Sequence, residues 1–246
     1  MKTEKKERPI LFSAPMARAL LEGRKTMTRR IIKPHPPAFV VAASLAHDNV
    51  WNFTNGKTVG LLNAPTKCPY GKPGDRLWVK ETHMYCEASL DSLQAKNGES
   101  RIVTNTNDDE GQQVEVFYKE SASNRTRFIL EAGSDLHWRP SIHMHRWASR
   151  ITLEITDVRV ERVESISEED AKAEGIRAFT KDGKLTKYWA CDPCDGPIKN
   201  TWQNLPHTAR EAFLSLFYDI NKRAKRGENP WVWCVSFRRI ENASKP

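Results

Sequence analysis

The sequence contains no hydrophobic run long enough to cross a membrane. A membrane-spanning helix needs roughly 20 consecutive apolar residues, and the apolar residues of this chain, 39% of 246, are dispersed. The charged residues 1–8 lead directly into Pro9 instead of an apolar stretch, a pattern that does not fit a secretory signal. From these absences we expect no membrane partner and a cytoplasmic location.

Cysteines are also scarce. Five are scattered along the chain, an odd number that argues against a disulfide framework. Cys191 and Cys194 have the spacing of half a zinc site, and Cys68, His207 or Cys234 could complete it in principle. Because a second CxxC pair is missing, we favour free thiols in a loop and predict neither a metal nor another cofactor.

The charge is unbalanced towards cations. The chain carries 39 lysines and arginines against 31 acidic residues, a net charge of +8. This excess favours anionic partners such as RNA, DNA or nucleotides, although a basic surface kept for solubility explains it equally well. No uninterrupted basic block of the kind found in nucleic-acid-binding tails is present.

Alternation and turn signals predict many short strands and few helices. We expect helices from Ser13 to Gly23, from Ser167 to Gly175, with Asp170 completing a capping box, and over 209–226. Polar residues 88–112 are interpreted as a mobile insertion and 176–206 as a loop. The expected strands cover residues 8–12, 26–32, 58–62, 76–81, 114–118, 151–163 and 231–237. This pattern is typical of an α+β barrel or curved sheet.

One short segment concentrates chemically useful side chains. Residues 23–30 read GRKTMTRR, with four cations and two hydroxyls directly after a predicted helix end. With the turn at 74–75, the helix at 166–175 and the strand around Phe237, this segment resembles the ASCH-domain family. Within that family it is similar to phage or prophage members and to the small bacterial N(4)-acetylcytidine amidohydrolases.

The resemblance implies a PUA-like β-barrel with flanking helices, spanning 1–246 as a single domain. It covers well under half of the chain. Residues 33–71, 82–149 and 176–229 have no counterpart in the small enzymes and are expected to be insertions.

The resemblance also implies three catalytic residues: Lys25 as base, Thr28 as nucleophile and Glu174 as proton donor. The chemistry is coherent, because a threonine hydroxyl needs a base and a lysine becomes one when burial or neighbouring cations lower its pKa. Residues three apart on a straight strand face opposite sides, so Lys25 and Thr28 meet only if the chain turns. The alternative is that Lys25 is a solvated cation and Thr28 an ordinary strand residue.

Further residues are expected to line a pocket, with aromatic and arginine side chains stacking on a base. Those around 143–147 could instead form a packed loop, and Trp231 and Trp233 are expected in the core. We also expect one face of the strand at 76–81 to open to a cavity, because Glu81 shares a face with Leu77 and Val79. The predicted substrate-binding residues are Arg24, Arg30, Trp78, Lys80, His143, His145 and Arg146.

These features predict an amidohydrolase acting on an acylated cytosine nucleoside such as N(4)-acetylcytidine. The alternative is a non-catalytic module that binds RNA or modified nucleotides. A third option is a phage accessory protein that docks on a host protein through its insertions.

Overall fold

The computed structural model describes residues 5–37, 39–55, 66–87, 100–104, 113–121, 137–180, 183–189 and 204–240. Over these residues the protein is α+β, with many strands and few helices, which confirms the coarse fold class. The predicted strand at 58–62 lies outside the described residues. The α-helices are α1 (Ala14–Leu21), α4 (Glu168–Ala173) and α5 (Ala209–Ile220). Short 3₁₀ turns lie at Lys119–Ser121, Ser141–His143, Arg146–Ala148 and Val163–Ser165.

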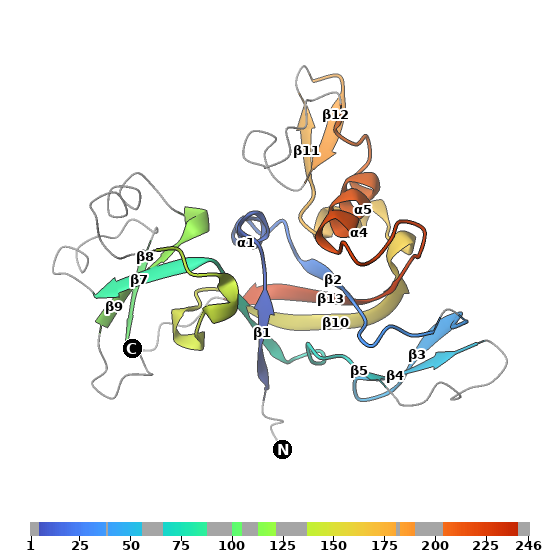
Figure 1. The fold of residues 1–246 in the computed structure, drawn as a ribbon, viewed down its shortest axis with the longest axis horizontal. Helices are drawn as coiled ribbons and strands as arrows, with labels where there is room; N and C mark the ends of the chain where they lie inside the picture. The colour runs from blue at the N-terminus through green and yellow to red at the C-terminus, as the bar shows by residue number, and fades with distance from the viewer. Residues whose placement is uncertain are drawn as a thin grey trace. The chain divides into compact units, whose positions relative to one another are not determined.

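The largest sheet has five strands in the order β1-β6-β10-β13-β2. Figure 1 shows β2, β13 and β10 side by side in this order. All five strands coincide with expected ones. Over the described residues the sheet is open, with β1 and β2 at its two ends. Its members are β1 (Glu7–Leu11), β6 (Arg76–Lys80), β10 (Thr152–Arg162), β13 (Trp231–Ile240) and β2 (Met27–Ile31).

The chain forms two compact units, and neither is continuous in sequence. The first unit comprises Met1–Lys6, Ala19–Arg76 and Glu154–Arg239. The second unit comprises Glu7–Arg18, Leu77–Leu153 and Ile240–Pro246. That the whole chain acts as a single domain stays a prediction.

Aromatic residues build the core of the first unit. Trp231 and Trp233 are buried as expected, and they meet Phe53 and Trp51 edge-on at ring-centroid distances of 6.1 and 6.2 Å. Phe53 and Trp51 belong to a second sheet, which the sequence did not indicate. That sheet has the order β3 (Ala42–His47), β4 (Val50–Thr54) and β5 (Thr66–Lys67).

The loop predicted at 176–206 contains a hairpin, which corrects that prediction. Strands β11 (Arg177–Thr180) and β12 (Thr186–Trp189) pair in antiparallel fashion. Gly183 has a positive φ of 75°, and its N–H donates to Thr180 Oγ1. A glycine at that φ closes the turn between two short strands that are too brief to show clear alternation.

Helix α5 is shorter than predicted. It ends at Ile220 because the backbone of the C-cap residue Asn221 leaves helical geometry, with φ −98° and ψ 59°, and its side-chain amide donates to the Phe217 carbonyl at 2.8 Å. Phe213 and Phe217 are buried as expected. Ile220 is 63% exposed, so its predicted place on the buried stripe is wrong.

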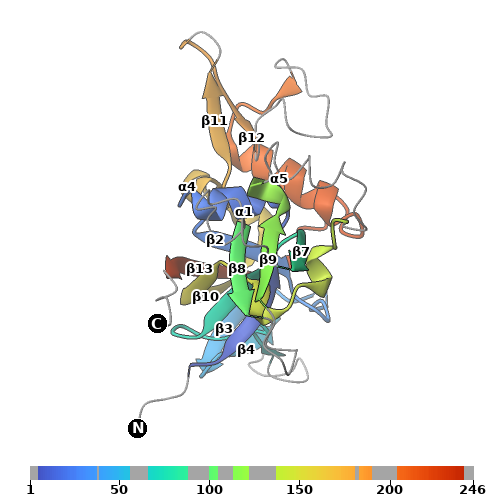
Figure 2. The same ribbon diagram turned by 90° about the vertical axis from the view of Figure 1, so that its left-hand side faces the viewer.

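The second unit contains a three-stranded antiparallel sheet in the order β7-β9-β8. Figure 2 shows β8 and β9 side by side. Residues 100–104, predicted to belong to a mobile insertion, form β8 instead. Ile102 and Val103 suit a strand, but their polar surroundings hid the signal. The strands are β7 (His83–Glu87), β8 (Ser100–Thr104) and β9 (Gln113–Tyr118).

A buried ion pair follows strand β6, where an open cavity was expected. Leu77, Val79 and Glu81 are all buried, so that expectation is wrong. Arg150 satisfies both carboxylate oxygens of Glu81: Nη2 donates to Oε1 at 2.9 Å and Nε to Oε2 at 3.0 Å. The Arg150 guanidinium also lies 4.0 Å from the centroid of the Tyr118 ring. A bidentate pair of this kind allows a carboxylate to share a face with apolar residues.

Candidate functional site

Backbone contacts bring Lys25 next to Glu174 in the first unit. Gly23, with a φ of 74°, ends helix α1, and the Lys25 N–H then donates to the Ala19 carbonyl at 3.0 Å. The Thr26 N–H donates to the Ala173 carbonyl at 2.8 Å, and Lys25 forms an antiparallel bridge with Glu174. The segment after α1 is thereby fixed to the end of α4.

The side chains of Lys25 and Glu174 form a buried ion pair. Lys25 Nζ lies 2.7 Å from Glu174 Oε2 and also donates to the Glu174 carbonyl at 2.7 Å. The two side chains are only 2% and 5% exposed. Burial lowers the pKa of Lys25, Glu174 opposes this, and the charges of Arg30 and Arg29 lower it further. The direction of the shift is therefore the one that a lysine base requires.

Gly175 makes this close approach possible. Its φ is 99°, and a Cβ atom placed there would lie 3.1 Å from Ala19 Cβ and 3.3 Å from Lys25 Cβ. Its carbonyl accepts a hydrogen bond from Arg24 Nη1 at 2.8 Å. Arg24, a predicted substrate-binding residue, thus reaches the same helix end as Lys25, while also pairing with Glu22.

Arg29 joins the site as a residue that sequence reasoning treated only as a neighbouring cation. Its side chain is fully buried, and Nη2 lies 2.6 Å from Asp170 Oδ2 and 3.1 Å from Glu161 Oε2. Its Nη1 lies 3.7 Å from Glu174 Oε1. The period-2 alternation of strand β2 would have placed Arg29 on one face, but it could not show that this face meets α4.

Asp170 binds arginine and does not complete a capping box. Ser167 Oγ accepts from the Asp170 N–H at 3.1 Å, so the predicted cap is present. The Asp170 carboxylate instead pairs with Arg29 and with Arg159, the latter at 3.2 Å. Burial opposes ionisation of Asp170, but these two arginines outweigh it and lower its pKa. Two nearby guanidinium groups compete more strongly for a carboxylate than one backbone N–H.

The second carboxylate oxygen of Glu174 is an open acceptor. Oε1 is buried and has no hydrogen-bond partner among the described residues. A buried carboxylate oxygen without a partner is unfavourable. The nearest cation to Oε1 is Arg29 Nη1, which lies at 3.7 Å, beyond hydrogen-bond distance.

Thr28 lies on strand β2, three residues after Lys25. It is buried in β2 opposite Val235, and alternation places it on the other face from Arg29. Within the described part of the chain, its hydroxyl makes no hydrogen bond to Lys25 or Glu174. The backbone changes partner at Thr26, whose carbonyl accepts from Phe237 while its N–H turns to Ala173. The alternation of β2 therefore does not extend to Lys25, and the predicted role of Thr28 stays a prediction.

The remaining predicted substrate-binding residues fall into two sets. Arg30 belongs to β2 of the first unit, opposite Trp233. Trp78, Lys80 and the residues around 143–146 belong to the second unit. Lys80 Nζ lies 5.3 Å from the Trp78 ring centroid and donates to the Ile142 carbonyl at 2.6 Å.

The segment around 143–147 forms 3₁₀ turns with exposed polar side chains. His143 and His145 are exposed, and the His145 ring stacks on Trp147 with centroids 6.0 Å apart. Arg146 pairs with Glu7 at 2.9 Å. These contacts resemble the packed-loop alternative, but they leave a His–Trp stack and the Lys80 side chain on the surface of the second unit.

The described residues hold no group of histidine, cysteine and carboxylate side chains that could bind a metal ion. Cys191 and Cys194 lie outside these residues, so the zinc alternative stays open. Among the described helices, none is both long and apolar enough to span a membrane.

Comparison with known proteins gives no relative. No family model matches the chain, and no curated protein or solved structure is significantly similar to it.

Proposed function

We propose that the protein hydrolyses the acyl amide of a modified cytosine nucleoside such as N(4)-acetylcytidine, on a PUA-like scaffold of the ASCH type in the cytoplasm. The observation that carries the proposal is the buried Lys25–Glu174 pair, in which Lys25 precedes Thr28 by three residues. The first motif, GRKTMTRR, contributes both the lysine and the threonine.

The pair can supply a base and an acid at the same time. In the ion pair, Lys25 is a cation and Glu174 a carboxylate, and neither is in its catalytic form. Transfer of one proton along the 2.7 Å hydrogen bond gives a neutral amine and a carboxylic acid. Burial disfavours charged forms, so the site reduces the difference in free energy between the ion pair and the neutral pair.

The proposed reaction has two steps. The neutral Lys25 amine takes the proton of the Thr28 hydroxyl, whose oxygen attacks the acyl carbonyl carbon. The C–N bond breaks as Glu174 gives its proton to the N4 nitrogen, which leaves as the amine of cytidine. Water then hydrolyses the acyl-threonine ester, releasing the carboxylic acid and regenerating the hydroxyl.

The direct test is release of cytidine and acetate from N(4)-acetylcytidine by purified protein. Thr28→Ala and Lys25→Ala should each remove turnover, because nucleophile and base act as a unit. Thr26→Ala is the matched control: it deletes the other hydroxyl of the motif, but its side chain is exposed and its activity should be retained. Wild-type protein that is inert on a panel of N(4)-acylated cytidines would contradict the proposal.

The second candidate is a module that binds RNA or modified nucleotides without catalysis. The net charge of +8 favours it. The same test distinguishes the two candidates. A binding module would retain its affinity for RNA in Thr28→Ala, and its wild type would release no product.

A further inference from the structure

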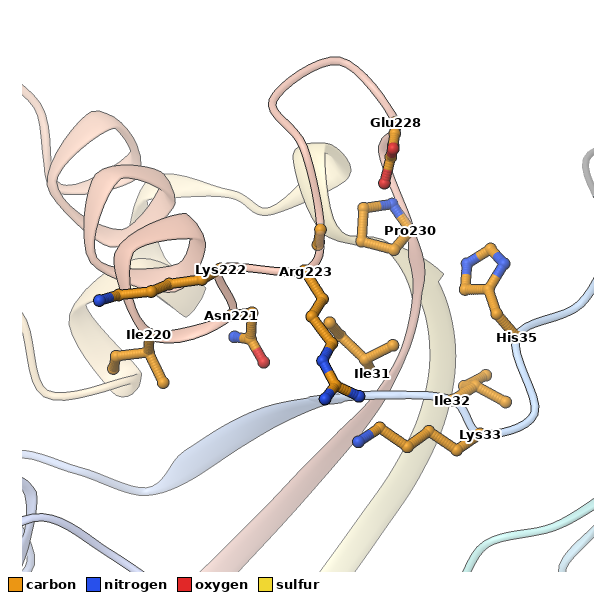
Figure 3. A pocket seen from close by; sticks show the side chains of 11 residues that line it. Ile31, Ile32, Lys33, His35, Ile220, Asn221, Lys222, Arg223, Glu228 and Pro230 are labelled. Atoms are coloured by element: carbon orange, nitrogen blue, oxygen red, sulfur yellow. The ribbon is translucent and has the colours of Figure 1, made fainter.

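A separate pocket of about 570 Å³ lies in the first unit, where helix α5 ends near the end of β2. Figure 3 shows its lining, with Ile31–Lys33 from the segment that ends β2, and Ile220–Arg223 from the end of α5. The loop before β13 adds Glu228 and Pro230. None of these residues belongs to the site at Lys25.

Three cations line this pocket without a matching set of anions. Lys33, Lys222 and Arg223 are exposed and, among the described residues, form no ion pair or hydrogen bond through their side chains. Figure 3 shows the side chains of Lys33 and Arg223 extending toward each other. The one carboxylate of the lining, Glu228, accepts a hydrogen bond from the backbone N–H of Lys225 at 3.0 Å. The Lys222 side chain points away from these two. Lys33 and Arg223 repel each other, so an anion between them would be favourable.

Stabilisation of the helix end does not account for these cations. Basic residues after a helix often bind its last carbonyls and interact with its dipole. Here the side chains of Lys222 and Arg223 form no hydrogen bond among the described residues, so neither binds a carbonyl of the helix end. Lys33 lies on a different segment altogether, so no helix-end role applies to it.

The lining also contains apolar side chains and a well-held histidine. Ile31, Ile220 and Pro230 provide apolar surface beside the cations. His35 Nε2 accepts the backbone N–H of Trp231 at 3.1 Å, which fixes the ring at the pocket wall. Cations beside an apolar wall suit a ligand that carries a phosphate next to a flat or apolar group.

We propose that this pocket binds a nucleotide, with its phosphate on Lys33 and Arg223. The inference deepens the proposed nucleic-acid function but uses none of the catalytic residues. Lys25 and Ile31 are six residues apart along an extended segment, roughly 20 Å. That separation exceeds the length of one nucleoside, so the pocket would hold a nucleotide several positions along an RNA chain whose modified base occupies the Lys25 site.

The experiment compares three probes: cytidine, cytidine 5′-monophosphate and a fluorescein-labelled single-stranded RNA 12-mer. Their dissociation constants are measured for the wild type, Lys33→Gln, Arg223→Gln and Lys225→Gln at several salt concentrations. Lys225→Gln is the matched control, because it removes one charge from the same exposed loop but does not line the pocket. Thermal melts establish that all variants are folded.

Each pocket variant should weaken RNA binding by about tenfold and reduce the salt slope by about one, with Lys225→Gln nearly unchanged. If the pocket variants bind both the monophosphate and RNA more weakly, the site accepts free nucleotides. If they bind only RNA more weakly, the site is specific for a chain. Both results support the proposal. The proposal would be overturned if Arg223→Gln and Lys225→Gln lost RNA affinity equally, or if neither lost any. Product release from N(4)-acetylcytidine is scored separately, so an inactive enzyme that binds phosphate here leaves this inference standing.

Discussion

Each unit contains a buried carboxylate paired with a cation, and these two pairs are built differently. In the second unit, Arg150 binds both oxygens of Glu81 and also donates from Nη1 to Ser121 Oγ at 2.7 Å. In the first unit, Lys25 binds one oxygen of Glu174, and the other has no hydrogen bond among the described residues. One pair is saturated, whereas the other retains a free acceptor.

The cations differ in a second respect. Arginine stays protonated in proteins, whereas a buried lysine loses its proton readily. Arg150 therefore gives no proton to Glu81, and that pair suits a structural role. In the proposed mechanism Lys25 gives its proton to Glu174, which is what acid–base chemistry needs.

The largest expected effect comes from replacing the lysine of the Lys25–Glu174 pair with arginine, the cation of the Glu81–Arg150 pair. Lys25→Arg keeps the positive charge but removes the base, so deacylation should fall by at least about 10⁴-fold. In the wild type, the active Lys25–Glu174 pair shares one proton, so kcat/KM should fall at high pH, where that proton is lost and no acid remains. Because burial lowers the pKa of Lys25, this fall should begin below the usual lysine pKa of 10.5. The checks are pH–rate profiles of both proteins; an active Lys25→Arg would remove the distinction between the pairs.

An intermediate effect should appear in stability. Arg150→Met leaves Glu81 buried without a cation and should lower the free energy of unfolding by about 3–5 kcal/mol. Lys25→Met should cost less, because Arg29 Nη1 remains 3.7 Å from Glu174 Oε1. Urea unfolding of both variants measures the difference. If Lys25→Met lowers the free energy of unfolding as much as Arg150→Met or more, the Lys25–Glu174 pair has a structural role as well.

The smallest effect tests how α4 positions Glu174. Ser167→Ala and Thr208→Ala each remove a helix cap, on α4 and α5 respectively, and each should cost about 1 kcal/mol of stability. Only Ser167→Ala loosens the helix that ends at Glu174, so only it should also reduce kcat. Calorimetry and kinetics on the two variants provide the comparison; equal rates would show that the Glu174 position does not depend on this cap.

Local sequence signals predicted most of the regular structure and one half of the site. Alternation located all five strands of the main sheet, and Ser167 correctly marked the start of α4. The contact between Lys25 and Glu174 followed only from the family resemblance, because 149 residues separate them. Arg29 was missed as a site residue for the same reason: its partners Asp170 and Glu161 lie on elements whose packing no local pattern reveals.

Other errors came from signals that were too short or too polar. Strand β8 is surrounded by polar residues, and the β11–β12 hairpin has only four residues in each strand. The end of α5 depends on the non-helical backbone of one residue, Asn221, which hydrophobic periodicity does not reveal. The burial of Glu81 required a partner, Arg150, that lies 69 residues away.

The two glycines that flank the Lys25 site set opposite limits for directed evolution. Both have a positive φ, but a Cβ on Gly23 would meet nothing within 4 Å, while one on Gly175 would press against Ala19 and Lys25. A saturation library at position 23 should therefore yield functional clones with asparagine, which tolerates that backbone conformation. The corresponding library at position 175 should return glycine alone, since any side chain there would separate the two segments that carry the lysine and the glutamate.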